Sequence, residues 1–281
     1  MNLDYISFKA LAKADGYCLI LDHIAASPAI TGWIAGNTHE ISIETKECSS
    51  MRVAVFHGSP RKGNTYSATK VFMDELSKSG NVDFTEFFLP EALPVFCTGC
   101  ALCLGGLRDK CPNEEYVTPI LNAVIEADAL LFSTPHYGAC SVPGSMQSLL
   151  DHLDFLVLNA SPRDEIFTKK AFILTTGAGT KAAVKPVQKL LLHWGVNRVY
   201  SLGIRLFADK WDKMPKPKQE RCERALRRSA IKFYQAKKGR PCLSTILFFY
   251  MSKFILKRYV GEGNAPYELW KENGYFDKRP F

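Results

Sequence analysis

The fold of this chain follows from residues 51–65, Met-Arg-Val-Ala-Val-Phe-His-Gly-Ser-Pro-Arg-Lys-Gly-Asn-Thr. The apolar run at 52–56 is typical of a buried strand, and residues 66–77 have the pattern of a helix. The segment between them is rich in glycine and hydroxyl side chains. A strand that feeds such a loop into a helix predicts a phosphate site, because the first amides of a helix lack intrahelical partners and lie at the positive end of its dipole.

The loop also offers side chains that can bind a phosphate. Five of them can donate hydrogen bonds or carry a positive charge: Ser59, Arg61, Lys62, Asn64 and Thr65. The loop lacks the lysine that a nucleoside-triphosphate loop has after its second glycine, and no G-x-G-x-x-G follows the strand. A mononucleotide with one terminal phosphate, such as FMN, therefore fits best. The alternative is an ordinary Gly-Ser-Pro turn with a helix cap at Asn64.

Strand and helix patterns alternate after residue 51. Strands are expected at Val53–Phe56, Val82–Leu89, Ala129–Ser133, Ala171–Thr175 and Val199–Ile204. Helices are expected near 65–79, 115–127, 144–157, 181–194 and 217–236. Five such βα units predict an α/β fold, a doubly wound five-stranded parallel sheet with helices on both faces, because parallel crossovers are right-handed.

Ligands of such folds bind beyond the carboxyl ends of the strands, so the loops there should carry binding chemistry. The loop after the third strand contains Pro-His-Tyr-Gly at 135–138, a rigid turn with an aromatic ring suited to a flat heterocycle. The loop after the fourth strand, Thr-Gly-Ala-Gly-Thr at 176–180, lets the backbone approach a ring closely. For His136 and Tyr137 the alternative is a packed surface aromatic. Three such loops on one βα array favour a shared ligand.

Four of the nine cysteines are crowded into a short segment that begins after the second strand. Cys97, Cys100, Cys103 and Cys111 form C-x-x-C-x-x-C-x7-C, followed by a proline. The first three spacings match those of a 4Fe–4S ligand run, although the ferredoxin pattern has a shorter last spacing. Four thiolates would also hold a zinc ion, and unliganded thiols are a third interpretation. The loop should open on the same sheet edge as the phosphate loop.

The chain resembles the flavodoxin-like NAD(P)H-dependent FMN reductase family, and within it the iron–sulfur flavoproteins. The resemblance covers about residues 51–205 and rests on 58–65, the cysteine run, 133–137, and Gln147-Ser-Leu-Leu-Asp151 with 175–179. It implies that Ser59, Arg61, Asn64 and Thr65 hold the FMN phosphate. It also implies that the isoalloxazine ring is framed by Pro135, His136, Tyr137 and Gly138 on one loop and by Thr176, Gly177 and Gly179 on the other.

One departure from the family concerns the helix that follows the loop at 135–138. The family often has Lys-x-x-x-Asp-Arg there, whereas this chain has Gln147 and His152 around Asp151. A longer last cysteine spacing is usual in the iron–sulfur flavoproteins, so the resemblance favours a 4Fe–4S cluster. The closing segment 267–277 resembles the tail of longer family members.

Composition and charge indicate a globular, cytoplasmic protein. The apolar content is 47%, and the sequence contains neither a candidate membrane span nor a signal peptide. From Arg205 onward the chain has 19 Lys and Arg against 8 Asp and Glu. This basic segment, densest at 213–240, has the spacing of a solvated helix face, and no nucleic-acid-binding motif accompanies it. Residues 243–260 are apolar but interrupted by lysine and arginine, which indicates a helix packed on the domain or on a second subunit, with membrane-surface docking as the alternative.

We therefore expect three parts: an N-terminal extension at 1–50, an FMN-binding domain at 51–240 and a C-terminal extension at 241–281. The expected activity is that of an FMN-dependent oxidoreductase in which NAD(P)H drives reduction of a quinone, a free flavin or another acceptor, with a possible contribution from the cluster. One alternative is an iron–sulfur flavoprotein coupled to a ferredoxin-type carrier. Another is a noncatalytic zinc module that binds an acidic partner. The family resemblance also implies a homo-oligomer.

Overall fold

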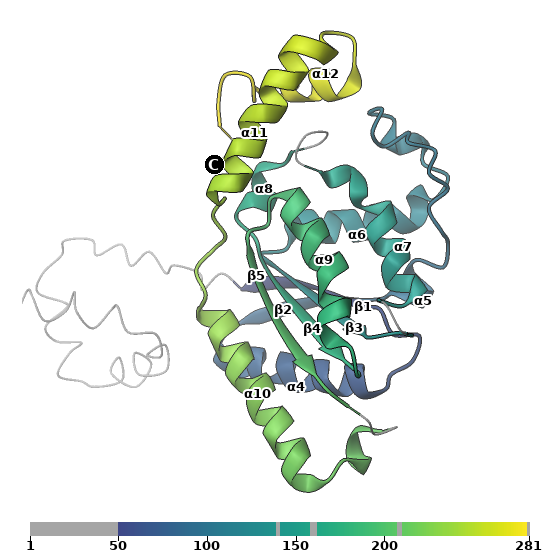
Figure 1. Cartoon of the computed structure of the whole chain (residues 1–281), viewed down its shortest axis with the longest axis vertical. Helices are drawn as coiled ribbons and strands as arrows, with labels where there is room; N and C mark the ends of the chain where they lie inside the picture. Colours follow the sequence, from purple (N-terminus) through teal and green to yellow (C-terminus); the bar gives the residue numbers. More distant parts are fainter. Residues whose placement is uncertain (1–49, 139–140, 158–161, 207–209, 280–281) are drawn as a thin grey trace, which may run out of the picture. The chain divides into compact units, whose positions relative to one another are not determined.

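The computed structural model describes residues 50–138, 141–157, 162–206 and 210–279. A parallel sheet with strand order β2-β1-β3-β4-β5 lies at the centre (Figure 1). The strands are β1 (Met51–His57), β2 (Val82–Phe88), β3 (Ala129–Pro135), β4 (Lys170–Thr176) and β5 (Arg198–Ile204). The order reverses direction between β1 and β3, and this is the place where doubly wound sheets bind ligands.

Helices cover both faces of the sheet. The first face carries α4 (Asn64–Ser79) and α10 (Lys216–Gln235), and the second carries α6 (Glu114–Glu126), α7 (Gly144–His152) and α9 (Thr180–Trp194) (Figure 1). Alternate residues of each central strand enter two separate cores. In β1, Val53 and Val55 pack toward the α4 face, whereas Ala54 and Phe56 pack toward the α6 face. Burial on both faces explains why the central strands are almost continuously apolar.

Shorter elements connect these helices and strands. They are α5 (Leu89–Ala92), α8 (Asp164–Phe167) and the 3₁₀ turns at Arg108–Lys110, Asp154–Leu156 and Trp211–Lys213. The C-terminal segment forms α11 (Leu243–Ile255), a π-helical turn (Leu256–Val260) and α12 (Ala265–Glu272). It has its own apolar cluster, in which Phe249 stacks on Trp270 with ring centroids 4.7 Å apart.

The structure confirms the expected fold class. Strands and helices lie within a few residues of their expected positions, except that the helix expected at 144–157 ends at His152 and a 3₁₀ turn follows. Residues 1–49 of the expected N-terminal extension lie outside the described residues, and the boundary expected at 240 and 241 stays a prediction. None of the described helices combines the length and apolar character needed to cross a membrane.

Two adjacent buried lysines at the start of β4 fasten helix ends to the sheet. The ammonium group of Lys169 donates hydrogen bonds to the Ile125 and Ala127 carbonyls at the end of α6. Lys170 donates to three carbonyls at the end of α10, those of Phe233 (2.7 Å), Tyr234 (2.9 Å) and Ala236 (3.0 Å). A cation is favoured at this position because the last carbonyls of a helix lack intrahelical donors and lie at the negative end of its dipole.

Replacing Lys170 with Met should therefore destabilise the fold. The substitution removes the donor for three carbonyls, so we expect the free energy of unfolding to fall by about 2 kcal/mol. Urea denaturation of the variant and wild type measures this difference. Lys232→Met, at an exposed position of α10, is the matched control and should change stability little. Equal losses in the two variants would contradict the role assigned to Lys170.

Candidate functional site

A cavity of about 550 Å³ lies at the carboxyl edge of the sheet. Its lining comes from three loops, those after β1, β3 and β4, together with Leu206 after β5. Cavities of 300–1,000 Å³ are typical of cofactor sites. The three loops that the sequence singled out therefore converge on one cavity.

The loop after β1 is tightly folded and leads directly into α4. The Ser59 hydroxyl donates to the Arg61 carbonyl at 2.7 Å, and α4 begins at Asn64. At Gly58 a Cβ would lie 2.8–2.9 Å from Met146 atoms, so only glycine fits against α7. At Gly63, in contrast, nothing lies within 4 Å of a Cβ position, which leaves room in front of the helix start. The arrangement fits a phosphate group approaching the first turn of a helix.

Two buried pairs of hydroxyl groups hold α4 against the sheet edge. Thr65 Oγ1 lies 2.7 Å from Thr176 Oγ1, and Thr69 Oγ1 lies 2.6 Å from Ser133 Oγ. Thr65 lies in the first turn of α4 and Thr176 ends β4, so their contact fixes the helix start relative to the loop after β4. The buried Thr65 hydroxyl is thus engaged with Thr176 in the structure.

The loops after β3 and β4 are fitted closely to each other. The His136 amide donates to the Thr176 carbonyl at 2.7 Å, and a Cβ at Gly179 would overlap the His136 ring. Gly177 has a positive φ of 119°, which L side chains rarely adopt. The two glycines thus allow the His136 backbone and ring to lie directly against the second loop. The Tyr137 side chain, 58% exposed, borders the cavity.

Most of the predicted cofactor-binding residues line this one cavity. They are Ser59, Arg61, Asn64, Thr65, Pro135, His136, Tyr137, Thr176 and Gly177. Lys62, Gly138 and Gly179 are not among the lining residues. The Lys62 ammonium instead lies 4.6 Å from the Phe88 ring centroid, in a cation–π contact that directs its charge away from the loop interior. Pro60, Gly63 and Leu206 also line the cavity, although the sequence did not single them out.

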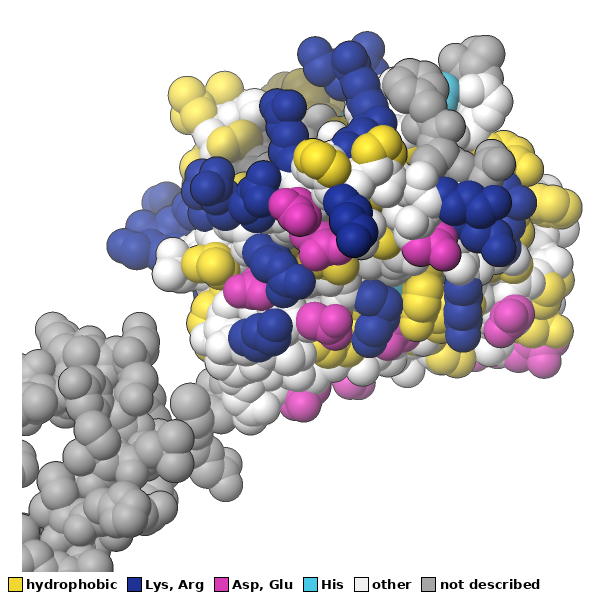
Figure 2. All heavy atoms as spheres, turned by 90° about the horizontal axis from the view of Figure 1, so that it is seen from below, with side chains coloured by type: hydrophobic (Ala, Val, Ile, Leu, Met, Phe, Trp, Pro, Cys, Tyr) yellow, Lys and Arg dark blue, Asp and Glu magenta, His cyan; other side chains and the backbone are white. Residues whose placement is uncertain are grey.

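The face that lies below the sheet in Figure 1, toward which the β5 arrow points, is the face drawn in Figure 2. Lys and Arg side chains gather over much of this face, with Asp and Glu interspersed among them (Figure 2). Clusters of one charge attract ligands of the opposite charge. This face therefore favours the approach of phosphate-bearing ligands to the carboxyl edge.

His57 is the last residue of β1 and directly precedes the loop that leads into α4. Its ring is 3% exposed, is stacked on Phe88 and lies with Nε2 2.8 Å from the Glu86 Oε2 atom. Burial lowers the pKa of His57 below its usual 6.5, and the Glu86 carboxylate opposes this effect. The neutral ring can donate to Glu86 and remain stacked, so protonation is not needed for the contact.

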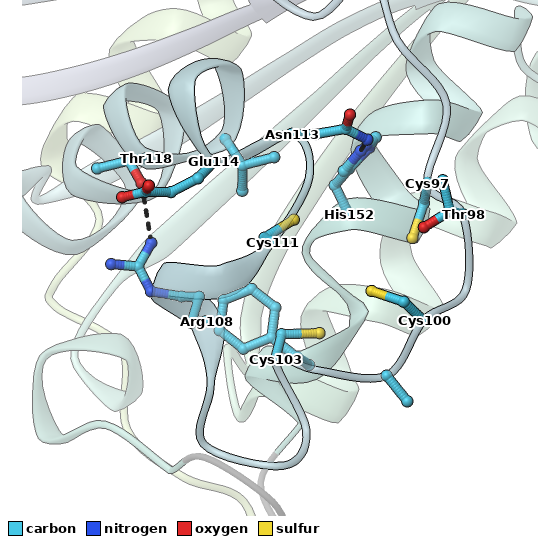
Figure 3. A pocket seen from close by; sticks show the side chains of 13 residues that line it. Cys97, Thr98, Cys100, Cys103, Arg108, Cys111, Asn113, Glu114, Thr118 and His152 are labelled. Atoms are coloured by element: carbon cyan, nitrogen blue, oxygen red, sulfur yellow. Dashed lines mark hydrogen bonds between the residues drawn. The ribbon is translucent and has the colours of Figure 1, made fainter.

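The four cysteines of the run line a second, smaller pocket. Figure 3 shows the side chains of Cys97, Cys100, Cys103 and Cys111 projecting from their loop toward a common space. Cys97 and Cys100 are exposed, and the other two are half-buried. Gly99, Ala101 and Gly106 all have positive φ angles, which turn the loop sharply around this space. An alanine in this conformation is strained, because its Cβ crowds the backbone.

Hydrogen bonds and burial act differently on the cysteine thiols. The Leu102 backbone and the Thr98 hydroxyl lower the pKa of Cys100 by hydrogen bonding to its sulfur. Burial raises the pKa of Cys103. Hydrogen bonds to sulfur are also a means by which proteins adjust the reduction potentials of iron–sulfur clusters.

Asn113 fastens both ends of the cysteine segment to α7. Its Nδ2 atom donates to the Phe96 carbonyl, just before Cys97, and to His152 Nε2, both at 2.9 Å. His152 Nδ1 in turn donates to the Ser148 carbonyl at 2.8 Å, which sets the ring tautomer. The Ser148 hydroxyl also donates to the Val95 carbonyl at 2.7 Å.

Sequence reasoning missed the role of Asn113 and treated His152 only as a departure from the family pattern. The signal was present in the buried-face spacing of Ser148 and His152, one helical turn apart on α7. Their partners at residues 95, 96 and 113 were not readable without the tertiary structure.

The two pockets have no lining residue in common. The cysteine segment does start beyond the carboxyl end of β2, as expected, but it then runs past α5 and packs along α7. The expectation that it opens on the same sheet edge as the flavin stays a prediction. A separate cavity of about 490 Å³ borders Cys97 and is lined by α7 and α9.

The sequence matches the family model described as NADPH-dependent FMN reductase over residues 51–212. This range contains all five strands and both pockets. The chain belongs to this family. Membership confirms the expectation of an FMN-containing, NAD(P)H-dependent oxidoreductase.

Individual relatives support the narrower resemblance. An iron–sulfur flavoprotein of Archaeoglobus fulgidus is 27% identical over 158 residues, which cover 54% of this chain and 69% of the relative. An iron–sulfur flavoprotein of Methanocaldococcus jannaschii is 25% identical over 144 residues, which cover 50% of this chain and 72% of the relative. The solved NAD(P)H:quinone oxidoreductase from Methanothermobacter marburgensis has a TM-score of 0.54 at 17% identity and aligns with 67% of this chain and 99% of its own. This last likeness shows the shared flavodoxin-like fold.

The stability of this family member should depend on pH through His57. Because burial lowers its pKa in the folded state, the unfolded chain binds the proton more readily once the pH falls below about 6.5. The stabilisation is present above that pH and lost below it. We expect the free energy of unfolding of wild type to fall between about pH 7 and about pH 5 by more than that of His57→Phe, which keeps the ring stacking.

His193→Phe, at an exposed position of α9, provides the control and should retain the wild-type pH dependence. Urea denaturation at several pH values measures all three slopes. Identical slopes for wild type and His57→Phe would refute the assignment.

Proposed function

We propose that the cavity at the carboxyl edge binds FMN, with the phosphate at the start of α4 and the ring between the loops after β3 and β4. The observation that carries the proposal is the convergence of the three loops on one 550 Å³ cavity that begins at a helix N-terminus. The donor set fits a phosphate, because it combines the helix start with Arg61 and Asn64. Bound FMN would supply the hydride and electron chemistry.

The residues of the chain would then position the cofactor and its reductant. The fitted loops at His136 and Gly177 present backbone groups and an open edge to a flat ring, while Tyr137 borders the entrance. The basic face of Figure 2 would attract the phosphates of NAD(P)H. The acceptor in this proposal is a small molecule, such as a quinone or a free flavin.

We also propose that the cysteine pocket holds a 4Fe–4S cluster. Such a cluster takes one thiolate on each of four irons, so its ligands surround a space without converging on one point. The four cysteines line one pocket, and their side chains point toward a common space (Figure 3). The C-x-x-C-x-x-C spacing and the similarity to proteins named iron–sulfur flavoproteins favour a cluster over the zinc site of the noncatalytic alternative.

The cluster would open a second route for electrons. A ferredoxin-type carrier is the alternative partner, and the 490 Å³ cavity beside Cys97 offers a place where a donor or acceptor could reach the cluster. The separation of the two pockets means that transfer between flavin and cluster would have to cross the region of α7 or pass between subunits of a homo-oligomer. The basic helix α10 remains, in this proposal, a solvated face without a specific nucleic-acid partner.

Loss of phosphate donors should weaken FMN binding. Arg61→Ala combined with Asn64→Ala removes a charge and an amide from the cavity, and we expect the Kd for FMN to rise about tenfold or more. Quenching of FMN fluorescence measures the affinity. Ser77→Ala, on the exposed side of α4, is the control. Unchanged affinity in the double variant would contradict the placement of the phosphate.

Removing one thiolate should affect the cluster without affecting the flavin. In Cys100→Ser purified without oxygen, iron and acid-labile sulfide should fall together while the FMN content stays at the wild-type level, because the FMN cavity has no residue from this loop. Cys222→Ser, at a half-buried cysteine outside the run, is the control. Zinc or no metal in the anaerobically prepared wild-type protein would overturn the cluster proposal.

A further inference from the structure

The helix α11 has an apolar face that no described part of the chain covers. Its exposed apolar side chains recur at helical spacing along one side: Leu243 (71% exposed), Leu247 (61%), Tyr250 (41%), Met251 (49%) and Phe254 (62%). Ile255 and Tyr259 extend the exposed surface to the end of the π-helical turn. Single exposed apolar residues are ordinary on protein surfaces, whereas a continuous stripe marks an interaction site.

The inward face of the same helix is less apolar than its outward face. The buried positions are Thr245, Phe249 and Ser252, followed by Leu256 in the π-helical turn. The Thr245 hydroxyl donates to Asn197 Oδ1 at 2.8 Å, so part of this face is held by polar contacts. Packing of α11 on the domain alone does not require leucine, methionine and phenylalanine on the outside. The pattern is that of a helix with a second apolar environment on its outer side.

The charges of the chain segment that carries this stripe are of one sign. Between Glu223 and Glu262 the chain has no aspartate or glutamate at all. Exposed cations flank the stripe at both ends: Lys237, Lys238 and Arg240 before α11, and Lys257 and Arg258 after it. Glu262, the first acidic residue beyond, is already paired with Lys271 at 3.0 Å.

We propose that α11 and the following π-helical turn dock on the surface of an anionic lipid bilayer. The apolar stripe would enter the boundary between head groups and acyl chains, and the flanking cations would pair with acidic head groups. Tyr250 in the middle of the outer surface and Tyr259 at its end suit this position, because their rings are apolar and their hydroxyls polar. The helix lies on the membrane in this account and does not span it.

Charge disfavours a second copy of this chain as the occupant. An isologous contact through the stripe would bring the same cations of two protomers together, and the segment between Glu223 and Glu262 offers no carboxylate to pair with them. An anionic lipid surface supplies that missing negative charge.

Docking would also bring the bilayer to the side of the cysteine loop. α12 packs on α11 through Phe249 and Trp270, and its first residue, Ala265, lies next to the cysteine loop, because a Cβ at Gly106 would be 3.3 Å from the Ala265 Cβ.

Flotation of the full-length protein with lipid vesicles tests this proposal without relying on enzymatic activity. Wild type should float with vesicles of phosphatidylcholine and phosphatidylglycerol, and much less with phosphatidylcholine alone or at high salt. Leu247→Glu combined with Phe254→Glu should abolish flotation, because it places two carboxylates in the stripe. Lys257→Gln combined with Arg258→Gln should weaken binding to the anionic vesicles on the order of tenfold.

The control is Leu192→Glu combined with Ile231→Glu, which adds the same charges at exposed apolar positions of α9 and α10. This variant should float like wild type, and circular dichroism should show that all variants are folded. Absence of flotation in wild type, or equal flotation of the Leu247→Glu/Phe254→Glu variant, would overturn the proposal. So would a wild-type oligomer that ignores vesicles and dissociates in that variant, which would assign the stripe to self-association.

Discussion

β1 pairs in parallel with β2 on one side and with β3 on the other, so the loops that follow these strands begin at the same edge of the sheet. The cavity for the cofactor is built from loops at this edge. The geometry of this carboxyl edge depends on hydrogen bonds between buried hydroxyl groups. The Thr65–Thr176 and Thr69–Ser133 hydroxyl pairs join α4 to β4 and β3, and so fix the helix start that faces the cavity. Because the interior is close-packed, a shift of α4 would disturb both strands and the loops that follow them.

The cysteine segment follows a different constraint, because it has little regular structure of its own. Hydrogen bonds from Asn113 and Ser148 attach its two ends to α7, and Gly106 lies against the start of α12. The segment is thus attached to the framework of the fold on one side, and on the other it lies next to the start of α12 in the C-terminal extension.

Patterns that repeat along the chain were readable from the sequence, and contacts between distant residues were not. The alternation of Val53 and Val55 with Ala54 and Phe56 indicates a strand buried on both faces, and the glycines at 58 and 63 indicate a loop against a helix start. Nothing local shows that Lys62 turns toward Phe88 or that His152 accepts a hydrogen bond from Asn113, because each depends on a partner from another strand or helix. The hydrogen bonds that attach the cysteine segment to α7 were not readable for the same reason.

The central claim is that the turn from β1 into α4 binds the phosphate of a flavin mononucleotide. Titration of the protein with FMN and, separately, with riboflavin isolates the phosphate, because the two ligands share the same ring. The account predicts that FMN binds about a hundredfold more tightly, as expected for two or more hydrogen bonds to a charged group. Equal affinities for FMN and riboflavin would contradict it.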